Sequence, residues 1–141
     1  MEGAILIIKL GALGDFIQAL GPIQAIREHH KNQKLTLLTA PSLQKIAIES
    51  NFVDEVILDE RPSSYNLFGI LKLRKQLTLR QFFRVYDLQT SQRSSMYFNL
   101  FWPGPYPEWS GIAKNCSHPH KNLHRNQMHT IDRQREQLQI A

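Results

Sequence analysis

The sequence predicts an α/β fold in which helices cover both faces of a mainly parallel sheet, a three-layer α/β/α arrangement. Short apolar runs alternate along the chain with longer stretches in which apolar residues recur at helical spacing. Strands separated by helices in this way are typical of parallel sheets built from successive strand–helix–strand units. The 141 residues, 42% hydrophobic and 21% charged, suit one globular domain with a sizeable core.

The first strand–helix unit lies at the start of the chain. Residues 4–8 form an apolar run rich in isoleucine with glycines on either side, the pattern of a strand buried on both faces. From Asp15 onward the apolar residues recur at helical spacing, and polar residues 27–30 close the expected helix. Pro22 lies inside this helix, so we expect a bend there, because proline lacks a backbone donor and crowds the preceding turn.

The alternation continues along the rest of the chain. Further strands are expected over residues 34–39, 55–58, 84–88 and 109–113. Further helices are expected over residues 42–50, 66–79 and 94–101. Residues 102–124 are rich in Pro, Gly, Asn, Ser and His, so most of this stretch is expected to be irregular.

An amphipathic helix is expected to begin at Met128. The predicted organisation is therefore a domain over residues 1–127 and, over residues 128–141, the start of a helix that leads to a further domain. No glycine cap or proline stop follows this helix, which favours a truncated sequence.

Composition and charge restrict the compartment and the partners. No apolar run approaches the ~20 residues that a transmembrane helix needs, and the first residues do not resemble a signal peptide, so a cytoplasmic location is expected. The single Cys116 agrees with a reducing compartment. A formal charge of +5 favours anionic partners such as phosphorylated glycolipids. The basic residues are scattered rather than grouped in a block, so no nucleic-acid partner is expected.

The turn Lys9-Leu10-Gly11-Ala12-Leu13-Gly14-Asp15 is the strongest candidate for a functional site. It follows the first strand, and open α/β sheets bind their ligands at the carboxyl ends of strands. Glycine permits a tight turn and leaves the first helical amides accessible to an anion. The turn matches neither the dinucleotide pattern G-x-G-x-x-G nor the Walker A pattern.

Asp15 and Lys9 each have two interpretations from the residues alone. Asp15 fits an N-terminal helix cap, which stabilises a helix by about 1 kcal/mol. It also fits a general base at the mouth of the sheet, able to accept a proton from a hydroxyl group. Lys9 fits either a charge that extends to solvent from a strand end or a cation that binds phosphate or carboxylate.

The opening segment ILIIKLGALGDFIQALGPIQAIR resembles the signature of glycosyltransferase family 9, the ADP-heptose:lipopolysaccharide heptosyltransferases. Members of that family begin with an aliphatic strand, a basic residue, a small-residue turn that ends in Gly-Asp, and a helix with proline in its second turn. Further similarity lies in NFVDEV at 51–56, YDLQTSQRS at 86–94 and HTIDR at 129–133. These segments follow the family's order over almost the whole chain.

The resemblance implies the N-terminal half of a GT-B enzyme, whose two Rossmann-like domains face each other across a cleft. Such enzymes are inverting, need no metal ion or cofactor, and use a nucleotide-sugar donor such as ADP-heptose. The N-terminal domain holds the acceptor, a lipopolysaccharide-core glycolipid, and Asp15 would be the catalytic base. The implied acceptor-binding residues are Lys9, Gly11, Ala12, Gly14 and Arg93. For Arg93 an ordinary surface arginine is the other interpretation.

Two departures from the family pattern affect these expectations. Many relatives carry a pair of hydroxyl residues where this chain has Gly11 and Ala12, so hydroxyl contacts from the turn are not assumed. The domain that binds the nucleotide is missing from the 141 residues, so the isolated chain is expected to be inactive or nearly so. A non-catalytic Rossmann-like module that binds an anion or a glycan is the alternative function. A dinucleotide-dependent oxidoreductase is disfavoured, because the glycine spacing differs and no acidic residue ends the second strand.

A Cys and His cluster, a set of aromatic residues and one expected helix each have both a structural and a functional interpretation. A Cys and His cluster contains zinc-ligating side chains, but its spacing matches no standard zinc pattern, so no metal site is expected. The cluster comprises Cys116, His118, His120, His124 and His129. Three aromatic residues are expected to pack a loop onto the core rather than stack on a sugar: Trp102, Tyr106 and Trp109.

The expected helix from Leu67 to Leu79 mixes apolar with basic residues. It fits a core-facing helix with a solvated basic face. It also fits weak attachment to the anionic inner face of the cytoplasmic membrane.

Overall fold

The computed structural model describes residues 3–63, 65–121 and 130–141. Its centre is one sheet of six strands in the order β3-β2-β1-β4-β5-β6, and every neighbouring pair is parallel. The strands are β1 (Ala4–Ile8), β2 (Lys34–Thr39), β3 (Glu55–Leu58), β4 (Phe82–Asp87), β5 (Glu108–Gly111) and β6 (His118–Pro119). The predicted α/β class with a mainly parallel sheet is confirmed.

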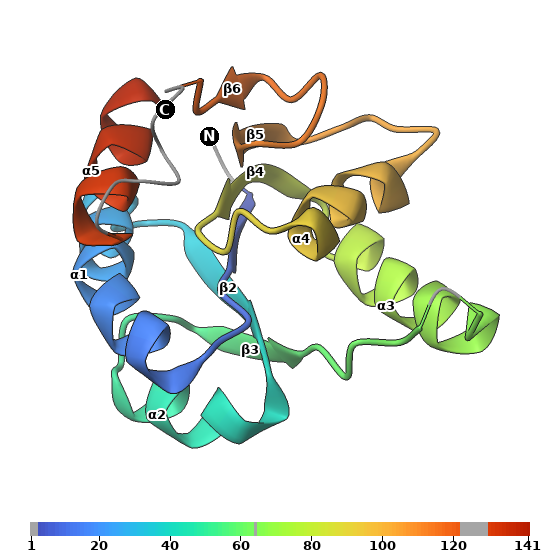
Figure 1. Ribbon diagram of the computed structural model, residues 1–141, viewed down its shortest axis with the longest axis horizontal. Helices are drawn as coiled ribbons and strands as arrows, with labels where there is room; N and C mark the ends of the chain where they lie inside the picture. The colour runs from blue at the N-terminus through green and yellow to red at the C-terminus, as the bar shows by residue number, and fades with distance from the viewer. Residues whose placement is uncertain (1–2, 64, 122–129) are drawn as a thin grey trace.

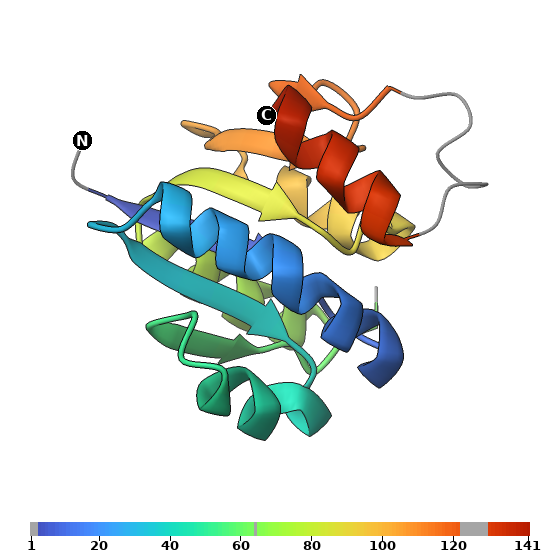
Figure 2. The same cartoon turned by 90° about the vertical axis from the view of Figure 1, so that its left-hand side faces the viewer.

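The helices form the two outer layers. They are α1 (Leu13–His29), α2 (Gln44–Glu49), α3 (Leu67–Leu79), α4 (Gln92–Tyr97) and α5 (Thr130–Ile140), with 3-10 turns at Pro41–Leu43 and Phe98–Phe101. Figure 1 shows α1, α2 and α5 on one side of the sheet and α3 and α4 on the other. In Figure 2, α1 and α5 lie side by side across their face of the sheet.

Side chains of β1 alternate between two cores, as expected for a strand buried on both faces. Ile5 and Ile7 belong to the cluster under α1, whereas Leu6 and Ile8 belong to the cluster under α3. All four side chains are fully buried. β1 therefore lies at the centre of the molecule, and the turn that follows it is held by a rigid strand.

Most predicted boundaries agree with the structure, and the differences have local causes. The first three strands have the predicted bounds, but the fourth begins at Phe82 rather than 84, because Phe82 extends the pairing of β4 with Ala4 of β1. The first helix begins at Leu13, two residues before Asp15, and continues through Pro22 to His29. The region expected as one helix over 94–101 is an α-helix followed by a 3-10 turn.

The loop-rich segment after Trp102 contains more strand than its composition predicted. Besides β5, the two-residue strand β6 pairs with β5 through Ser110 and His118. A strand of two residues is too short to produce an alternation that the sequence reveals. Trp109 is fully buried and confirms the packing prediction, but Trp102 is 69% exposed, so the prediction is wrong for that residue.

α5 is attached to the carboxyl end of the sheet by amide side chains. Gln137 Nε2 donates to the carbonyl oxygens of Asp87 (2.9 Å) and Ser110 (3.1 Å), and Gln134 Nε2 donates to that of Leu88 (3.3 Å). Both glutamines are buried. The predicted helix start at Met128 lies outside the described residues, and the division of the chain at residue 127 stays a prediction.

Candidate functional site

The carboxyl ends of the central strands meet at one edge of the sheet, because all the strands are parallel. β1 ends beside Lys9, β3 beside Asp59, and β4 at Asp87. β4 lies next to β1 in the sheet, so residues about eighty positions apart in sequence meet at the same edge. This edge holds the turn singled out from the sequence.

The turn after β1 has a backbone that requires glycine at one of its two glycine positions. Gly11 has φ +138°, a conformation that residues with a side chain rarely adopt. Around Gly14, by contrast, an added Cβ would meet no atom within 4 Å. The turn is fastened to the end of β4, since the Leu10 amide donates to Gln89 Oε1 at 3.0 Å. A rigid backbone thus presents the open position Gly14 to solvent.

The N-terminus of α1 has no capping side chain. Ala12 occupies the cap position, and no side chain accepts from the first amides of the helix. These amides and the positive end of the helix dipole are therefore available to an anionic group.

Asp15 is the third residue of α1 and is exposed. It makes no hydrogen bond or ion pair with any of the described residues, so its interpretation as a helix cap is wrong. As an acidic residue in the first turn of α1, Asp15 interacts favourably with the positive end of the helix dipole, and its carboxylate is open to solvent. Its position at the mouth of the sheet is the one expected of a general base.

Lys9 is the first residue of this turn and is only 3% exposed, so the interpretation as a charge extending into solvent is wrong. Burial lowers the pKa of Lys9 because the charged ammonium loses hydration, and Arg133 lowers the pKa further. The negative charges of Asp15 and Asp87 oppose this effect. The result is a buried basic group near the one exposed carboxylate of the turn.

Asp87 ends β4 and is completely buried. Its Oδ1 accepts from the Thr90 amide and its Oδ2 from Ser94 Oγ, both at 2.9 Å. Desolvation raises the pKa of Asp87 to about 6, although these hydrogen bonds and the Lys9 charge act in the opposite direction. Asp87 therefore orders the start of α4 and contributes negative charge beneath the turn, without access to solvent.

Arg93, predicted as an acceptor contact, is the second residue of α4 and is half-buried. Its Nη1 donates to the Pro62 carbonyl oxygen at 3.2 Å and to Tyr97 Oη at 3.3 Å. Tyr97 in turn donates to Asp59 Oδ2 at 2.6 Å, and burial together with Asp59 raises the pKa of Tyr97 to about 12. Arg93 thus connects α4 to the segment after β3, and its predicted contact with an acceptor stays a prediction.

Arg61 is a cation at this edge that the sequence analysis missed. Its backbone amide donates to Asp59 Oδ1 (2.8 Å) and its Nη2 to the Leu10 carbonyl oxygen (3.1 Å), and the side chain is exposed. It lines a cavity of about 600 Å³ together with Gly11 and Ala12 of the turn. The rule that ligands bind after parallel strands, applied to β3 as well as β1, would have found it.

The Cys and His cluster does not form a metal centre within the described residues, where no three His, Cys, Asp or Glu side chains are placed to hold an ion. Cys116 is buried, which raises the pKa of its thiol, and its Sγ lies 3.8 Å from the Gly111 carbonyl oxygen. His120 forms a contact of 3.2 Å with Glu136. His124 and His129 lie outside the described residues.

Among the helices described, none has the length and apolar character needed to cross a bilayer.

A parallel sheet with a glycine turn at its carboxyl edge and helices on both faces is a Rossmann-like fold, and solved glycosyltransferases share it. The glycosyl transferase family 9 protein from Veillonella parvula DSM 2008 matches with a TM-score of 0.78 and 19% identity, over 98% of this chain and 40% of that chain. The E. coli heptosyltransferase WaaC with ADP-2-deoxy-2-fluoro heptose matches with a TM-score of 0.70 and 18% identity, over 95% of this chain and 46% of that one.

The E. coli ADP-heptose lps heptosyltransferase II matches with a TM-score of 0.68 and 17% identity, over 86% of this chain and 35% of that one. No family model and no curated protein matches the sequence. The chain therefore has the fold of part of these enzymes and spans less than half of their length. This likeness agrees with the family resemblance of the opening segment.

Proposed function

We propose that this chain is the acceptor-side domain of a family 9 glycosyltransferase of the heptosyltransferase type. The enzyme would transfer a sugar from a nucleotide-sugar such as ADP-heptose to a lipopolysaccharide-core acceptor. The observation that carries the proposal is the exposed Asp15 carboxylate, which makes no hydrogen bond or ion pair with a described residue and lies at the carboxyl edge of a fold shared with heptosyltransferases.

The proposed chemistry is a single inverting displacement that needs no metal ion. Asp15 accepts the proton of an acceptor hydroxyl while the hydroxyl oxygen forms a bond to the anomeric carbon of the sugar. The bond between that carbon and the diphosphate oxygen breaks, and its electron pair leaves with the nucleoside diphosphate. Attack from the face opposite the leaving group inverts the anomeric configuration.

The turn and its neighbours would hold the acceptor. Anionic groups of the acceptor meet the uncapped amides of α1 and the guanidinium of Arg61, while Lys9 contributes positive charge from its buried position without direct contact. The open space over Gly14 admits the acceptor close to the backbone. Ala12 and Arg93 complete the proposed acceptor-binding set, with Ala12 contributing backbone rather than a hydroxyl.

The nucleotide-sugar would bind to a second domain outside these residues. WaaC, one of the structural neighbours, was solved with ADP-2-deoxy-2-fluoro heptose, and this chain spans 46% of it. A base without a donor cannot transfer a sugar, so we propose that the isolated chain is inactive. The proposed location is the cytoplasm, next to the inner face of the membrane that holds the acceptor.

The test is a glycosyl-transfer assay with ADP-heptose and a deacylated lipopolysaccharide-core acceptor. The chain alone is compared with a fusion to the remaining part of the Veillonella parvula protein and with the fusion carrying Asp15→Asn. Asp132→Asn is the matched control, because Asp132 is another exposed carboxylate in the first turn of a helix. Loss of at least about a hundredfold in kcat is expected for Asp15→Asn only.

Transfer that survives Asp15→Asn unchanged would refute the assignment of the base. A fusion that folds and binds both ligands but transfers nothing would favour the alternative, a non-catalytic module that binds an anion or a glycan. The uncapped, exposed helix start is the observation on which that second candidate rests.

A further inference from the structure

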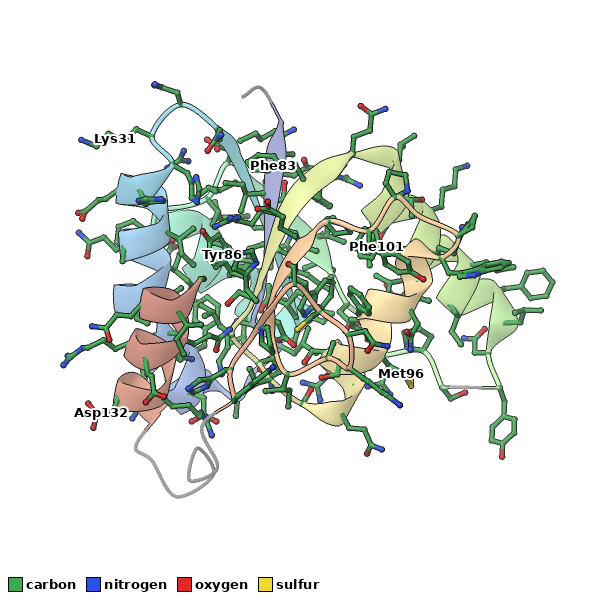
Figure 3. All side chains as sticks on the ribbon, turned by 90° about the horizontal axis from the view of Figure 1, so that it is seen from above. Lys31, Phe83, Tyr86, Met96, Phe101 and Asp132 are labelled. Atoms are coloured by element: carbon green, nitrogen blue, oxygen red, sulfur yellow. The ribbon has the colours of Figure 1, made fainter. Side chains whose placement is uncertain are left out.

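The outer face of α3 exposes large apolar side chains to solvent. Phe68 is 86% exposed, Leu79 is 71% exposed, and Tyr65, just before the helix, is 97% exposed. Figure 3 shows side chains extending outward from this helix, at the opposite side of the molecule from the labelled Lys31. We name as the α3 surface the residues Tyr65, Phe68, Leu71, Lys72, Lys75 and Leu79.

Helical spacing places this set on one face. Phe68, Lys72, Lys75 and Leu79 follow one another at intervals of three or four residues, so they lie along a single stripe. The opposite face of α3 contains Leu73 and Leu77, which are buried in the core. The helix therefore already has a core-facing side, and its exposed apolar residues form a second, outward side.

The charge of this outward side is positive. α3 contains no Asp or Glu, and neither Lys72 nor Lys75 forms an ion pair with a described residue. By contrast, Arg74 donates to the Trp102 carbonyl oxygen at 2.8 Å, and Arg80 is paired with Glu55. The two lysines are thus free to meet an anionic partner.

We propose that the α3 surface binds the face of an anionic phospholipid bilayer. The apolar side chains would enter the boundary between headgroups and acyl chains, while the ammonium groups contact lipid phosphates. A second copy of the chain is a poorer occupant, because a symmetric contact would oppose lysine with lysine. A nucleic acid would satisfy the lysines but would leave Leu71 and Leu79 against a polar surface.

The orientation of the helix places the bilayer beside the candidate site. The segment from Asp59 to Asn66 leads from the end of β3 to the start of α3, and Arg61 in this segment lines the site cavity. The exposed start of α3 therefore lies on the edge of the molecule that carries the site. The idea that bilayer binding brings the site close to a lipid-linked acceptor rests on the proposed function, whereas bilayer binding itself does not.

Co-sedimentation with lipid vesicles tests the proposal on the 141-residue chain. Vesicles of phosphatidylcholine with about one third phosphatidylglycerol are compared with vesicles of phosphatidylcholine alone. The chain is expected to bind the anionic vesicles at least about tenfold more tightly, and added salt is expected to weaken the binding.

Two double variants separate the two contributions. Lys72→Gln/Lys75→Gln is expected to weaken binding by at least about tenfold, because each lysine near an anionic surface contributes about fivefold. Phe68→Ser/Leu71→Ser is expected to cause a similar loss by removing the inserted apolar area. The controls, Lys31→Gln/Lys114→Gln and Ile48→Ser/Ile140→Ser, change other exposed residues of the same kinds and are expected to bind as the parent does.

Equal losses in the variants and their controls would overturn the proposal, as would equal binding to the two kinds of vesicle. Binding of the chain to an oligonucleotide but not to vesicles would also overturn it. The same holds if the chain does not bind vesicles but forms a dimer that the α3 variants abolish. Circular dichroism checks that each variant is folded. Because the vesicle assay contains no sugar donor or acceptor, its failure leaves the glycosyltransferase proposal intact, and the reverse also holds.

Discussion

Substituting the two glycines of the turn after β1 with alanine is predicted to change stability in opposite directions. Gly11 has φ +138°, and alanine there must adopt a strained backbone at a cost of about 1 to 3 kcal/mol. The nearest atoms to its added Cβ would be 3.7 Å away, an ordinary contact, so the penalty is conformational rather than steric. Gly14 lies in the first turn of α1 with open space around it, so alanine is expected to stabilise the helix by up to about 1 kcal/mol.

Thermal and urea denaturation followed by circular dichroism measure both effects. For a domain of this size about 1 kcal/mol corresponds to roughly 4 °C in Tm, so Gly11→Ala should lower Tm by about 4 to 12 °C. Gly14→Ala should raise it by up to about 4 °C. In the active fusion, Gly14→Ala should raise KM for the acceptor despite its added stability, because the methyl group occupies the proposed acceptor space.

Equal stability of Gly11→Ala and the parent would refute the strained turn. A Gly14→Ala variant that is as destabilised as Gly11→Ala would show that the space around Gly14 is filled. Gly21→Ala is a useful control, since Gly21 is also helical and its added Cβ would meet no atom within 4 Å.

Three further predictions concern buried and capping groups. The pKa of Asp87 is raised from 3.8 to about 6, so the folded state retains a proton that the unfolded state releases between these values. As the pH rises from about 4 to about 6, the free energy of unfolding of the unsubstituted chain should therefore fall by up to about 3 kcal/mol relative to that of Asp87→Asn, as measured by urea titrations. A difference between the two proteins that does not change with pH would contradict this. Tyr97→Phe removes the donor to Asp59 Oδ2 and should cost about 1 to 3 kcal/mol in the same assay, whereas no loss would show that the hydrogen bond is replaced. Asn66→Ala removes the cap that accepts from the Gly69 amide at 3.0 Å and should cost about 1 kcal/mol, with Asn66→Asp, which keeps the acceptor, near neutral.

The positions of the strands were predictable from the sequence because burial leaves a local pattern. The runs at 4–8, 34–39 and 55–58 have the observed bounds, because each is a short stretch of mainly apolar or β-branched residues, although among the three only the run at 4–8 is buried along its whole length. The candidate turn was also predictable, because its glycines and Asp15 follow the first of these runs directly. The two-residue β6 was not, because it is too short to carry a period.

The surface of α3 shows a limit of helical periodicity. The apolar residues of this helix were expected either to face the core or to face a membrane. The structure buries Leu73 and Leu77 while it exposes Phe68 and Leu79, so this helix has a core-facing side and a second, solvent-exposed apolar side. Spacing shows which residues share a face, but burial depends on which elements cover that face.

By itself the sequence determined the α/β class, the alternation of strands and helices as far as β5, and the turn that ends at Asp15. Only the tertiary structure decided that Asp15 is exposed without a capping role, that Lys9 is buried near Asp87, and that Arg61 joins the site. Periodicity is a property of neighbours along the chain, so the sequence displays it directly. Which charged side chains lie close together depends on the order of strands in the sheet, which places β4 beside β1. No local sequence pattern predicts that order.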